Sequence, residues 1–597
     1  MSFISIISII SNKTYEINSI QTFISSFHSL DIIYFIIFIL LSIFYYRILK
    51  IKDKKIISYS IFGATILTLC KLIGSNIHNF THIINGYANL FNIIFNLIIF
   101  IGYFIIFFSV LSSLFNYVIN KENIFLESQL KSNFFTENTK SFLIIAGIFI
   151  CCWSIYFIIF FPGIVTWDSY NQITQAMGFV KINNQNPILH TLIMGAFIKL
   201  GSIILGNVNL GISFFTVFQM LFCAFTYSLV IRQLIKKNIN KYFIIFAFCF
   251  YAFHPLIACY SITLWKDIWI SNFLILYIIY LIEIQHDKDK FFSSKINLIF
   301  FPIIILGVLF SKGTGIIMLI ISFPILIFEH KEYWKYLLSI FSITFSIYLL
   351  ATGPLLKLLN IDGAKQQDML SIPSQQIART VKEHRACLSE EEQEIIESIL
   401  PINELANLYN PRLADYVKEK INLNNYNKNK WIYIKTWVKL GLRYPITYLD
   451  AFLSNSYGYW YPDIKYWVIA NDSYLKRLNM YKENNWYYGD KENYPPVSNI
   501  RSSIQDNFML FIDNIRSIPV TSVLFSIGFY TWIQFIIFLI CMIQNKKKVL
   551  LPFSTILAVF ISCILSPVHA EMRYAYLIIL SLPITISFID KSKHYLS

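Results

Sequence analysis

Runs of about 20 apolar residues recur along most of this chain, and each is long enough to cross the hydrocarbon core of a bilayer as a helix. The chain has 597 residues, of which 56% are hydrophobic and only 14% are charged. An average soluble protein carries about 25% charged residues. The sequence therefore predicts an all-α polytopic membrane protein, because a membrane span must satisfy its backbone hydrogen bonds internally.

The formal net charge of +15 is concentrated in short loops between the apolar runs. Examples are RILKIKDKK after the first run, RQLIKKNINK after residue 231 and NKKK near residue 545. Lys and Arg in short loops mark the cytoplasmic side of a membrane. We interpret the charge as membrane topology with some preference for anionic lipid, and we expect no nucleic-acid partner.

Loop charge predicts about thirteen spans with a cytoplasmic C-terminus. The segment 187–205 is apolar enough to cross, but its crossing would place the cations of RQLIKKNINK outside. We therefore expect it to stay outside as a juxtamembrane or re-entrant helix within one external loop, 162–208. The predicted spans are 31–48, 56–75, 89–118, 141–161, 209–235, 242–262, 267–284, 296–311, 313–329, 334–353, 519–542, 549–567 and 575–589.

Composition divides the chain into four regions. Residues 1–140 hold the N-terminal membrane helices, 141–354 the membrane core, 355–518 a small external domain and 519–597 the C-terminal membrane helices. The external domain has ordinary charge density and should be mostly helical, since SEEEQEIIESIL begins with a capping box. It also contains the aromatic run SYGYWYPDIKYW, whose side chains we expect to help recognise an acceptor.

The exit of the run 141–160 carries the most suggestive residues, which are Trp167, Asp168, Tyr170 and Gln172. A carboxylate among aromatic and amide side chains suits a sugar, which stacks on rings and forms hydrogen bonds. A charge beside the membrane is costly and therefore indicates function. The alternative is that Asp168 only caps a short helix. This stretch alone leaves both interpretations open.

Three predicted external loops each hold an isolated cation: Lys266, Lys312 and Arg573. Asp267 follows the first of them, and Glu571 lies two residues before the last. Cations on one membrane face could converge on a phosphate through charge-assisted hydrogen bonds. Each could instead reach lipid headgroups on its own. With Asp168 predicted on the same face, we favour the phosphate site.

Two further residues are weaker candidates for substrate contacts. His190 lies near the start of a predicted helix in NPILHT, where a packed histidine is common. Arg379 lies in the polar segment SIPSQQIAR of the external domain. It could bind an acceptor or order the domain, and the sequence does not separate the two.

An outward span, an external loop with Asp168 beside the membrane and a Pro-led juxtamembrane helix together resemble the GT-C superfamily of membrane glycosyltransferases. That superfamily includes protein O-mannosyltransferases and lipid A aminoarabinose transferases. The resemblance covers the layout of residues 141–590 and places the first-loop acid on Asp168, the second on Asp267 and the late phosphate-binding Arg on Arg573. The chain departs from the family at Asn186, where relatives often have a basic residue.

The resemblance implies a glycosyltransferase that moves a sugar, with inversion, from a polyprenyl-phosphate donor to a cell-envelope acceptor on the external face. Asp168 would be the general base, and Lys266, Lys312 and Arg573 would bind the donor phosphate. No cofactor is then required, although Asp168 and Asp267 could hold Mg²⁺ or Mn²⁺. The alternatives are a transporter or flippase of a lipid-linked sugar, or a polysaccharide polymerase or ligase of another fold. The high Ile, Asn, Lys and Phe content suggests a bacterial cell membrane.

Overall fold

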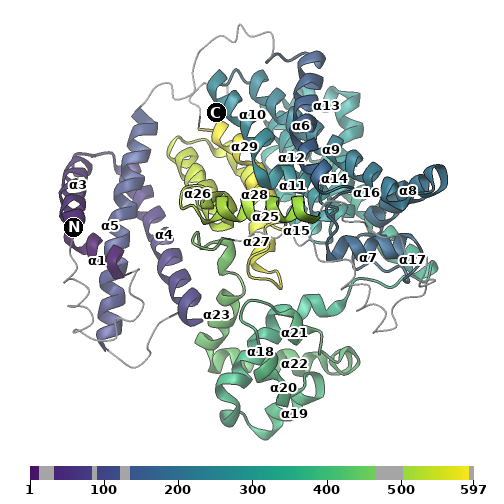
Figure 1. Ribbon diagram of the computed structural model, residues 1–597. Helices are drawn as coiled ribbons and strands as arrows, with labels where there is room; N and C mark the ends of the chain where they lie inside the picture. Colours follow the sequence, from purple (N-terminus) through teal and green to yellow (C-terminus); the bar gives the residue numbers. More distant parts are fainter. Residues whose placement is uncertain (12–31, 84–89, 121–134, 466–501, 590–597) are drawn as a thin grey trace.

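The chain folds into α-helices throughout the part that the computed structural model describes, which comprises residues 1–11, 32–83, 90–120, 135–465 and 502–589 (Figure 1). Extended pairing within these residues is limited to isolated bridges. The helices up to residue 352 are α1 (Ser2–Ser11), α3 (Ile32–Ile48), α4 (Lys54–Phe80), α5 (Leu90–Asn120), α6 (Thr139–Ile159), α7 (Trp167–Ala176), α8 (Ile188–Leu205), α9 (Val208–Lys236), α10 (Lys241–Phe253), α11 (Pro255–Ser261), α12 (Lys266–His286), α13 (Lys288–Ser293), α14 (Lys295–Ser311), α15 (Gly315–Glu329), η1 (Lys331–Tyr333) and α16 (Trp334–Thr352).

The remaining helices form a separate lobe and then return to the bundle (Figure 1). They are α17 (Pro354–Leu358), η2 (Gln366–Leu370), α18 (Ser371–His384), η3 (Arg385–Cys387), α19 (Glu390–Ile399), α20 (Ile402–Leu408), α21 (Asp415–Lys418), α22 (Leu423–Arg443), α23 (Pro445–Ser454), η4 (Tyr457–Tyr459), α25 (Ser502–Ser517), η5 (Ser522–Phe525), α26 (Ile527–Ile543), η6 (Lys547–Val549), α27 (Leu550–Ile564), α28 (Tyr576–Leu580) and α29 (Leu582–Ser587).

Eight helices of the described part are long and apolar enough to cross a membrane, and a ninth span results if α10 and α11 are counted as one bent span. Four further apolar helices have 10–17 residues. The chain is therefore an all-α membrane protein, as predicted. The larger number of about thirteen spans stays a prediction from loop charge.

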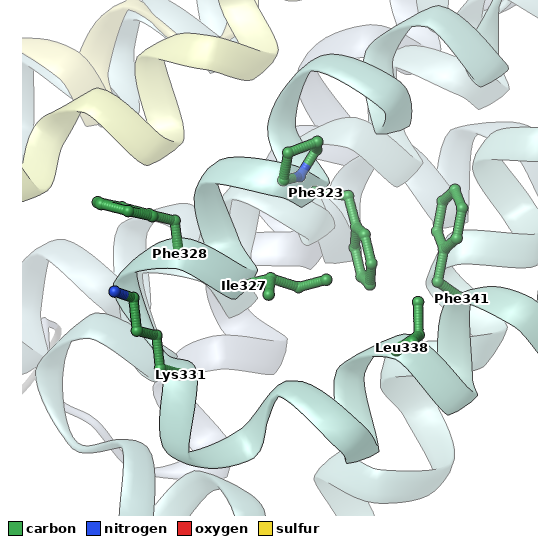
Figure 2. Close-up of a pocket in the computed structure, with 7 residues that line it drawn as sticks. Phe323, Ile327, Phe328, Lys331, Leu338 and Phe341 are labelled. Atoms are coloured by element: carbon green, nitrogen blue, oxygen red, sulfur yellow. The ribbon is translucent and has the colours of Figure 1, made fainter.

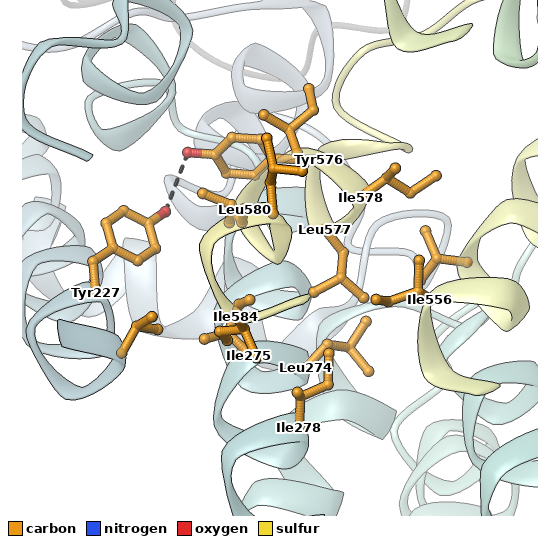
Figure 3. Packing of buried hydrophobic residues seen from close by; sticks show 14 of the residues in the cluster. Tyr227, Leu274, Ile275, Ile278, Ile556, Tyr576, Leu577, Ile578, Leu580 and Ile584 are labelled. Atoms are coloured by element: carbon orange, nitrogen blue, oxygen red, sulfur yellow. Dashed lines mark hydrogen bonds between the residues drawn. The ribbon is translucent and has the colours of Figure 1, made fainter. Parts of the chain in front are cut away.

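The largest core lies where α9, α12 and the C-terminal helices meet. Figure 3 shows Leu274 and Ile278 of α12 packed near Ile556 of α27 and the apolar side chains of α28. At its edge, the hydroxyl oxygens of Tyr227 and Tyr576 lie 3.1 Å apart in a hydrogen bond. A buried tyrosine keeps such a partner because an unpaired hydroxyl is costly in apolar surroundings.

Two predicted spans near the C-terminus differ from the observed helices. The predicted span 575–589 is divided into α28 and α29, with Pro583 in the first turn of α29. The carbonyl groups freed by the break are bonded by side chains: the Tyr251 hydroxyl donates to Leu580 O and the Gln534 amide to Ile578 O. The predicted span 519–542 begins as a helix only at residue 527. Broken backbone inside a membrane protein requires such internal partners.

The loops that are rich in lysine lie together at one end of the bundle. Lys55 Nζ donates to Asn545 Oδ1 at 3.0 Å, and Gln285 Nε2 donates to Lys548 O at 2.6 Å. Lys236 Nζ lies 2.7 Å from Glu283 Oε2. Since α12 has 21 residues, its first residue lies roughly 30 Å from this end. We call the two ends of the bundle the basic end and the site end.

Helix α8 is apolar and long enough to span, yet its packing keeps it near the site end. It contacts the first third of α9, where a Cβ atom on Gly201 would lie 2.3 Å from the Gly211 backbone. Small residues allow two helix backbones to approach this closely. Figure 1 shows α8 extending away from the bundle beside α7 and α17, and α8 reaches α9 through Gly206 and Asn207. That α8 stays on one side of the membrane remains a prediction.

The helices from η2 to α23 form a small helical domain with its own apolar core. The capping box predicted from the sequence is present: Ser389 N donates to Glu392 Oε2, and Glu392 N donates to Ser389 Oγ. The aromatic run that follows this domain behaves differently from the prediction. Tyr457, Trp460 and Tyr461 are buried against α4 and α26, so they are packed between helices and are not placed to recognise an acceptor.

The two ends of the bundle generate a labelling prediction. Cys387 is exposed on the helical domain, and a membrane-impermeant thiol reagent added to intact cells should label it. In a Cys387→Ser background, Leu205→Cys should also react from outside, because we place the turn after α8 at the site end. Lys237→Cys at the basic end should react only after the cells are permeabilised.

Labelling of Lys237→Cys in intact cells would show that the orientation is reversed. Labelling of Leu205→Cys only after permeabilisation would show that α8 crosses the membrane. The Cys387→Ser parent reports the background from Cys151, which is the other exposed cysteine of the described residues.

Candidate functional site

Two helix starts lie side by side because the backbone segments that precede them pair in parallel. Ile164 N donates to Ile262 O at 2.9 Å, and Leu264 N donates to Ile164 O at 3.1 Å, which forms a bridge between Ile164 and Thr263. Asp168 and Asp267 each lie four residues after a bridged residue. The pairing therefore sets two carboxylates, one on α7 and one on α12, at equivalent positions in the first turns of their helices.

Side chains of α9 hold this pairing in place. Thr216 Oγ1 donates to Pro162 O at 2.8 Å, and Gln219 Nε2 donates to Thr263 O at 2.7 Å. Gly163 makes the close approach possible, because its φ of 141° lies in a region that L-residues rarely adopt and a Cβ there would lie 2.5 Å from Thr216 Oγ1. The loop after α6 is thus pinned to the loop before α12.

Six charged side chains from four segments meet at these helix starts, and we call them the ion cluster. They are Asp168, Lys266, Asp267, Lys312, Glu571 and Arg573. Three are acids and three are bases, so the cluster is formally neutral. All six belong to the residues that the sequence singled out as candidates for a site.

Arg573 is the centre of the ion cluster. Its Nη1 atom donates to Asp168 Oδ2 at 2.7 Å and lies 3.9 Å from Asp267 Oδ2. Its Nε atom lies 3.6 Å from Glu571 Oε1. The segment between α27 and α28 therefore supplies a cation that bridges the two helix-start carboxylates.

The two lysines complete the pairing of the carboxylates. Lys312, directly after α14, donates from Nζ to Asp267 Oδ1 at 2.6 Å. Lys266 Nζ lies 3.8 Å from Asp168 Oδ2 and also donates to the side-chain oxygen of Asn186. Asn186, directly before Pro187, thus positions Lys266.

The two carboxylates differ in their access to solvent. The Asp168 side chain is 26% exposed, whereas that of Asp267 is 1% exposed. Asp267 Oδ2 forms no hydrogen bond within the described residues, so its charge is balanced by Lys312 and Arg573. Asp168 is therefore the acid that an incoming molecule can reach, and Asp267 is part of the supporting structure.

Asp168 is an anion at neutral pH. Burial by itself raises its pKa, but the charges of Arg573 and Lys266 outweigh burial and hold the pKa of Asp168 well below its usual range. A carboxyl group with a lowered folded-state pKa stabilises the fold above its ordinary pKa, and this contribution is lost as the pH falls through the folded value. Asp168 thus stays paired with Arg573 across the physiological range.

Two aromatic residues that the sequence analysis missed form a wall of the ion cluster. Lys312 Nζ lies 3.7 Å from the centre of the Tyr574 ring, and Arg573 Cζ lies 4.8 Å from that of Trp265. Cations over aromatic faces are attracted by the ring quadrupole. Each of the two aromatic residues is adjacent in the chain to a predicted cation, in LWKD and in MRYA. This adjacency is the one feature of the sequence that could have indicated them as site residues.

Other predicted substrate contacts pack beneath the cluster. Gln172 is buried and donates from Nε2 to Thr191 Oγ1 at 2.8 Å, which fastens α7 to α8. Tyr170 is also buried. His190 is enclosed by the rings of Phe215 and Trp269, as expected of a packed histidine. The side chain of Trp167 lies outside the described part of the structure.

Arg379 lies apart from the ion cluster, so the structure does not bring it together with the other candidates. It is 1% exposed in the helical domain. Its guanidinium donates to Glu383 Oε1 at 2.8 Å and to Thr81 O at 2.8 Å, and it lies 3.4 Å from Asp450 Oδ2. These partners join the domain to the end of α4. Of the two sequence-based roles, the ordering of the domain fits this placement.

Two alternative roles for Asp168 can be compared with the geometry. The N-cap of α7 is Thr166, whose backbone N–H donates to Ser169 Oγ at 3.3 Å, so Asp168 is not the cap. A divalent ion between Asp168 and Asp267 would have to displace Arg573 from both carboxylates. No group of three or more His, Cys, Asp or Glu side chains suited to a metal occurs among the described residues. In this arrangement both carboxylates are paired with cations.

A pocket of about 430 Å³ lies elsewhere, between α15 and α16 (Figure 2). Its lining residues are Phe323, Pro324, Ile327, Phe328, Lys331, Leu338 and Phe341. Its lining is almost entirely apolar, and Lys331 lies next to Glu332, which pairs with Lys288 near the basic end of the bundle. The pocket has none of the paired acids and bases of the ion cluster.

Fold and site together define an all-α membrane protein with a partly buried ion cluster at one end of its helical bundle. A family model described as "Family of unknown function (DUF6020)" matches residues 177–596. The chain belongs to this family, because the match covers more than half of it. Lys266, Asp267, Lys312 and Arg573 lie inside the matched region, and Asp168 lies before it. None of the curated proteins and none of the solved structures matches the chain.

The buried pair of Asp267 and Lys312 generates a stability prediction. Asp267→Asn should destabilise the protein by about 3 kcal/mol, because it leaves the charge of Lys312 without its partner in a desolvated site. The double variant Asp267→Asn with Lys312→Gln should recover part of that loss. The midpoint of thermal unfolding of the purified protein measures both effects.

The exposed pair of Lys181 and Asp362 is the matched control. Their side chains are 61% and 69% exposed, so Asp362→Asn should cost less than about 1 kcal/mol. Equal effects of Asp267→Asn and Asp362→Asn would contradict the supporting role of Asp267.

Proposed function

We propose that this protein is a membrane glycosyltransferase that uses a polyprenyl-phosphate-linked sugar as donor, with Asp168 as the general base. One observation carries the proposal: an accessible carboxylate is held among three cations that come from separate loops. Transfer of a sugar from a phosphate needs a base for the acceptor and cations for the leaving group. The ion cluster holds both kinds of group within reach of each other.

The neutrality of the ion cluster suggests how a donor would enter. A donor phosphate adds negative charge, and it competes with Asp168 for Arg573 Nη1 and Lys266 Nζ. The first turns of α7 and α12 add the partial positive charge of helix N-termini. When the cations turn toward the phosphate, the negative charge of Asp168 is less well balanced by positive charge, and the pKa of Asp168 rises. The resting ion pair thus keeps the carboxylate ionised, and donor binding makes it a stronger base.

The proposed reaction is a single displacement at the anomeric carbon. The acceptor hydroxyl oxygen forms a bond to that carbon while its proton passes to Asp168. The bond between the carbon and the phosphate oxygen breaks, and its electron pair leaves with the polyprenyl phosphate. Arg573, Lys266 and Lys312 stabilise the charge that develops on the phosphate. The products are an inverted glycoside and polyprenyl phosphate, and the proton on Asp168 is released to solvent.

Transport of a lipid-linked sugar is the competing proposal, and the distribution of charge favours transfer. Ionisable groups of a transport pathway lie along the route through the membrane. In α12, which runs from the ion cluster to the basic end, no acidic or basic residue occurs between Asp267 and Glu283. The charges of the ion cluster gather at the site end, as a reaction at the membrane surface requires.

Substitution of Asp168 tests the proposed chemistry. Asp168→Asn keeps the shape of the side chain but removes the proton acceptor, so release of polyprenyl phosphate from labelled donor should fall by at least about a hundredfold. Donor affinity should stay the same or increase, because Arg573 no longer has Asp168 as its partner. Turnover is measured with purified protein, labelled donor and a cell-envelope extract as the source of acceptor.

Arg573→Ala is the complementary variant, and it should weaken binding of polyprenyl phosphate as well as turnover. Lys181→Ala, in an exposed ion pair outside the ion cluster, serves as the control and should change neither. An Asp168→Asn protein with undiminished turnover would remove Asp168 from the mechanism. Wild-type protein that moves the intact donor across vesicles without cleaving it would favour transport.

A further inference from the structure

Helix α22 of the helical domain carries an apolar stripe that faces away from its own domain. Tyr433, Thr436 and Leu440 are buried in the domain, whereas Trp431 and Leu442 are 78% and 80% exposed. The exposed pair is separated by eleven residues, or about three turns, and therefore lies on one face of the helix. A soluble helix normally places polar residues on the face opposite to its core.

The stripe continues along the chain beyond these two residues. Its exposed apolar members are Trp431, Val438, Leu442, Ile446 and Leu449. The only non-helical backbone inside α22 is at Asn429, before the stripe begins. The part of the stripe on α22 is therefore carried by regular helix up to Arg443. Tyr444, with φ −125° and ψ 59°, separates it from the exposed Ile446 and Leu449 of α23.

The same helix is strongly basic. Residues Leu423–Arg443 contain Lys428, Lys430, Lys435, Lys439 and Arg443 and no acidic residue. Lys439 and Arg443 pair with Glu392 of α19. Exposed Lys435 lies four residues after Trp431, on the same face as the stripe. Exposed aromatic and aliphatic residues on a basic helix are typical of a helix that lies in the surface of an anionic bilayer.

The place of α23 in the fold brings this face to the membrane boundary. Asp450 of α23 accepts a hydrogen bond from Ile83 N at 2.7 Å, just beyond the end of the membrane-length helix α4. Figure 1 shows α23 beside that end of α4, with the rest of the domain below it. The chain enters the domain after α16, and the segment that follows α23 is bonded to α26, where Trp532 Nε1 donates to Trp460 O at 2.8 Å. The end of the stripe on α23 thus lies beside the end of a helix that is long enough to span the membrane.

We propose that the face of α22 and α23 formed by Trp431, Val438, Leu442, Ile446 and Leu449 docks on the surface of the protein's own bilayer. The apolar side chains enter the boundary between headgroups and acyl chains, and Lys428, Lys430 and Lys435 contact anionic headgroups. Docking fixes the orientation of the helical domain relative to the bundle. The inference rests on the exposed face and its charge and is independent of the proposed glycosyl transfer.

A nitroxide label at position 431 of the full chain tests the proposal. Cys151→Ser and Cys387→Ser remove the exposed cysteines, and Trp431→Cys or Leu442→Cys is then labelled in nanodiscs of phosphatidylglycerol and phosphatidylcholine. Dissolved oxygen, which concentrates in lipid, should relax these labels more than a water-soluble nickel complex does. Tyr416→Cys is the matched control, since Tyr416 is an aromatic residue of the same domain, 54% exposed and outside the stripe. A label at position 416 should be relaxed more by the nickel complex than by oxygen.

The lysines provide a second measurement. We expect the equilibrium constant for docking to fall by roughly fivefold in each of three single variants, Lys428→Gln, Lys430→Gln and Lys435→Gln. The fall is measured as greater accessibility of the label at position 442 to the nickel complex. Labels at 431 and 442 that are as accessible to nickel as the label at 416 would overturn the proposal. Protection from both reagents would also overturn it, because protein would then cover the face. Docking that is unchanged in all three lysine variants would contradict the role of anionic lipid.

Discussion

The backbone pairing between Ile164 and Thr263 determines the geometry of the site end. It joins a loop that leaves α6 to a loop that enters α12, roughly a hundred residues later. Because the pairing is parallel and each helix starts at the same distance from it, Asp168 and Asp267 occupy matching positions. Thr216 and Gly163 hold the pairing against α9. With any other register, the two carboxylates would not lie close enough together to share the guanidinium of Arg573.

The ion cluster follows from the cost of burying charge. An unpaired carboxylate in apolar surroundings is strongly disfavoured, so a buried acid requires nearby cations. Arg573 meets this need for Asp168, and Lys312 meets it for Asp267. Each cation comes from a different loop, so formation of the cluster ties the C-terminal segment to the first loop. The same arrangement keeps a reachable carboxylate ionised, which is the property that the proposed transfer reaction uses.

The helical domain shows where composition alone misleads. Its polar sequence left open whether Arg379 binds an acceptor or orders the domain, and the structure pairs that guanidinium with Asp450 and with the end of α4. The aromatic run Tyr457–Tyr461 was expected to recognise an acceptor, yet it fills the space between α4 and α26. In both cases the residue types are equally suited to recognition and to packing between helices, and only the neighbouring segments distinguish the two roles.

The sequence by itself determined the membrane class, the helical content and the isolated charges that make up the ion cluster, because length, hydropathy and the cost of membrane charge are local properties. Tertiary structure decided which charge pairs with which, the contribution of Asn186, Trp265 and Tyr574, and the break of the final apolar run into α28 and α29. These features depend on contacts between residues that lie tens to hundreds of positions apart. Such contacts arise when distant segments pack together, so they cannot be predicted from the composition of any one segment.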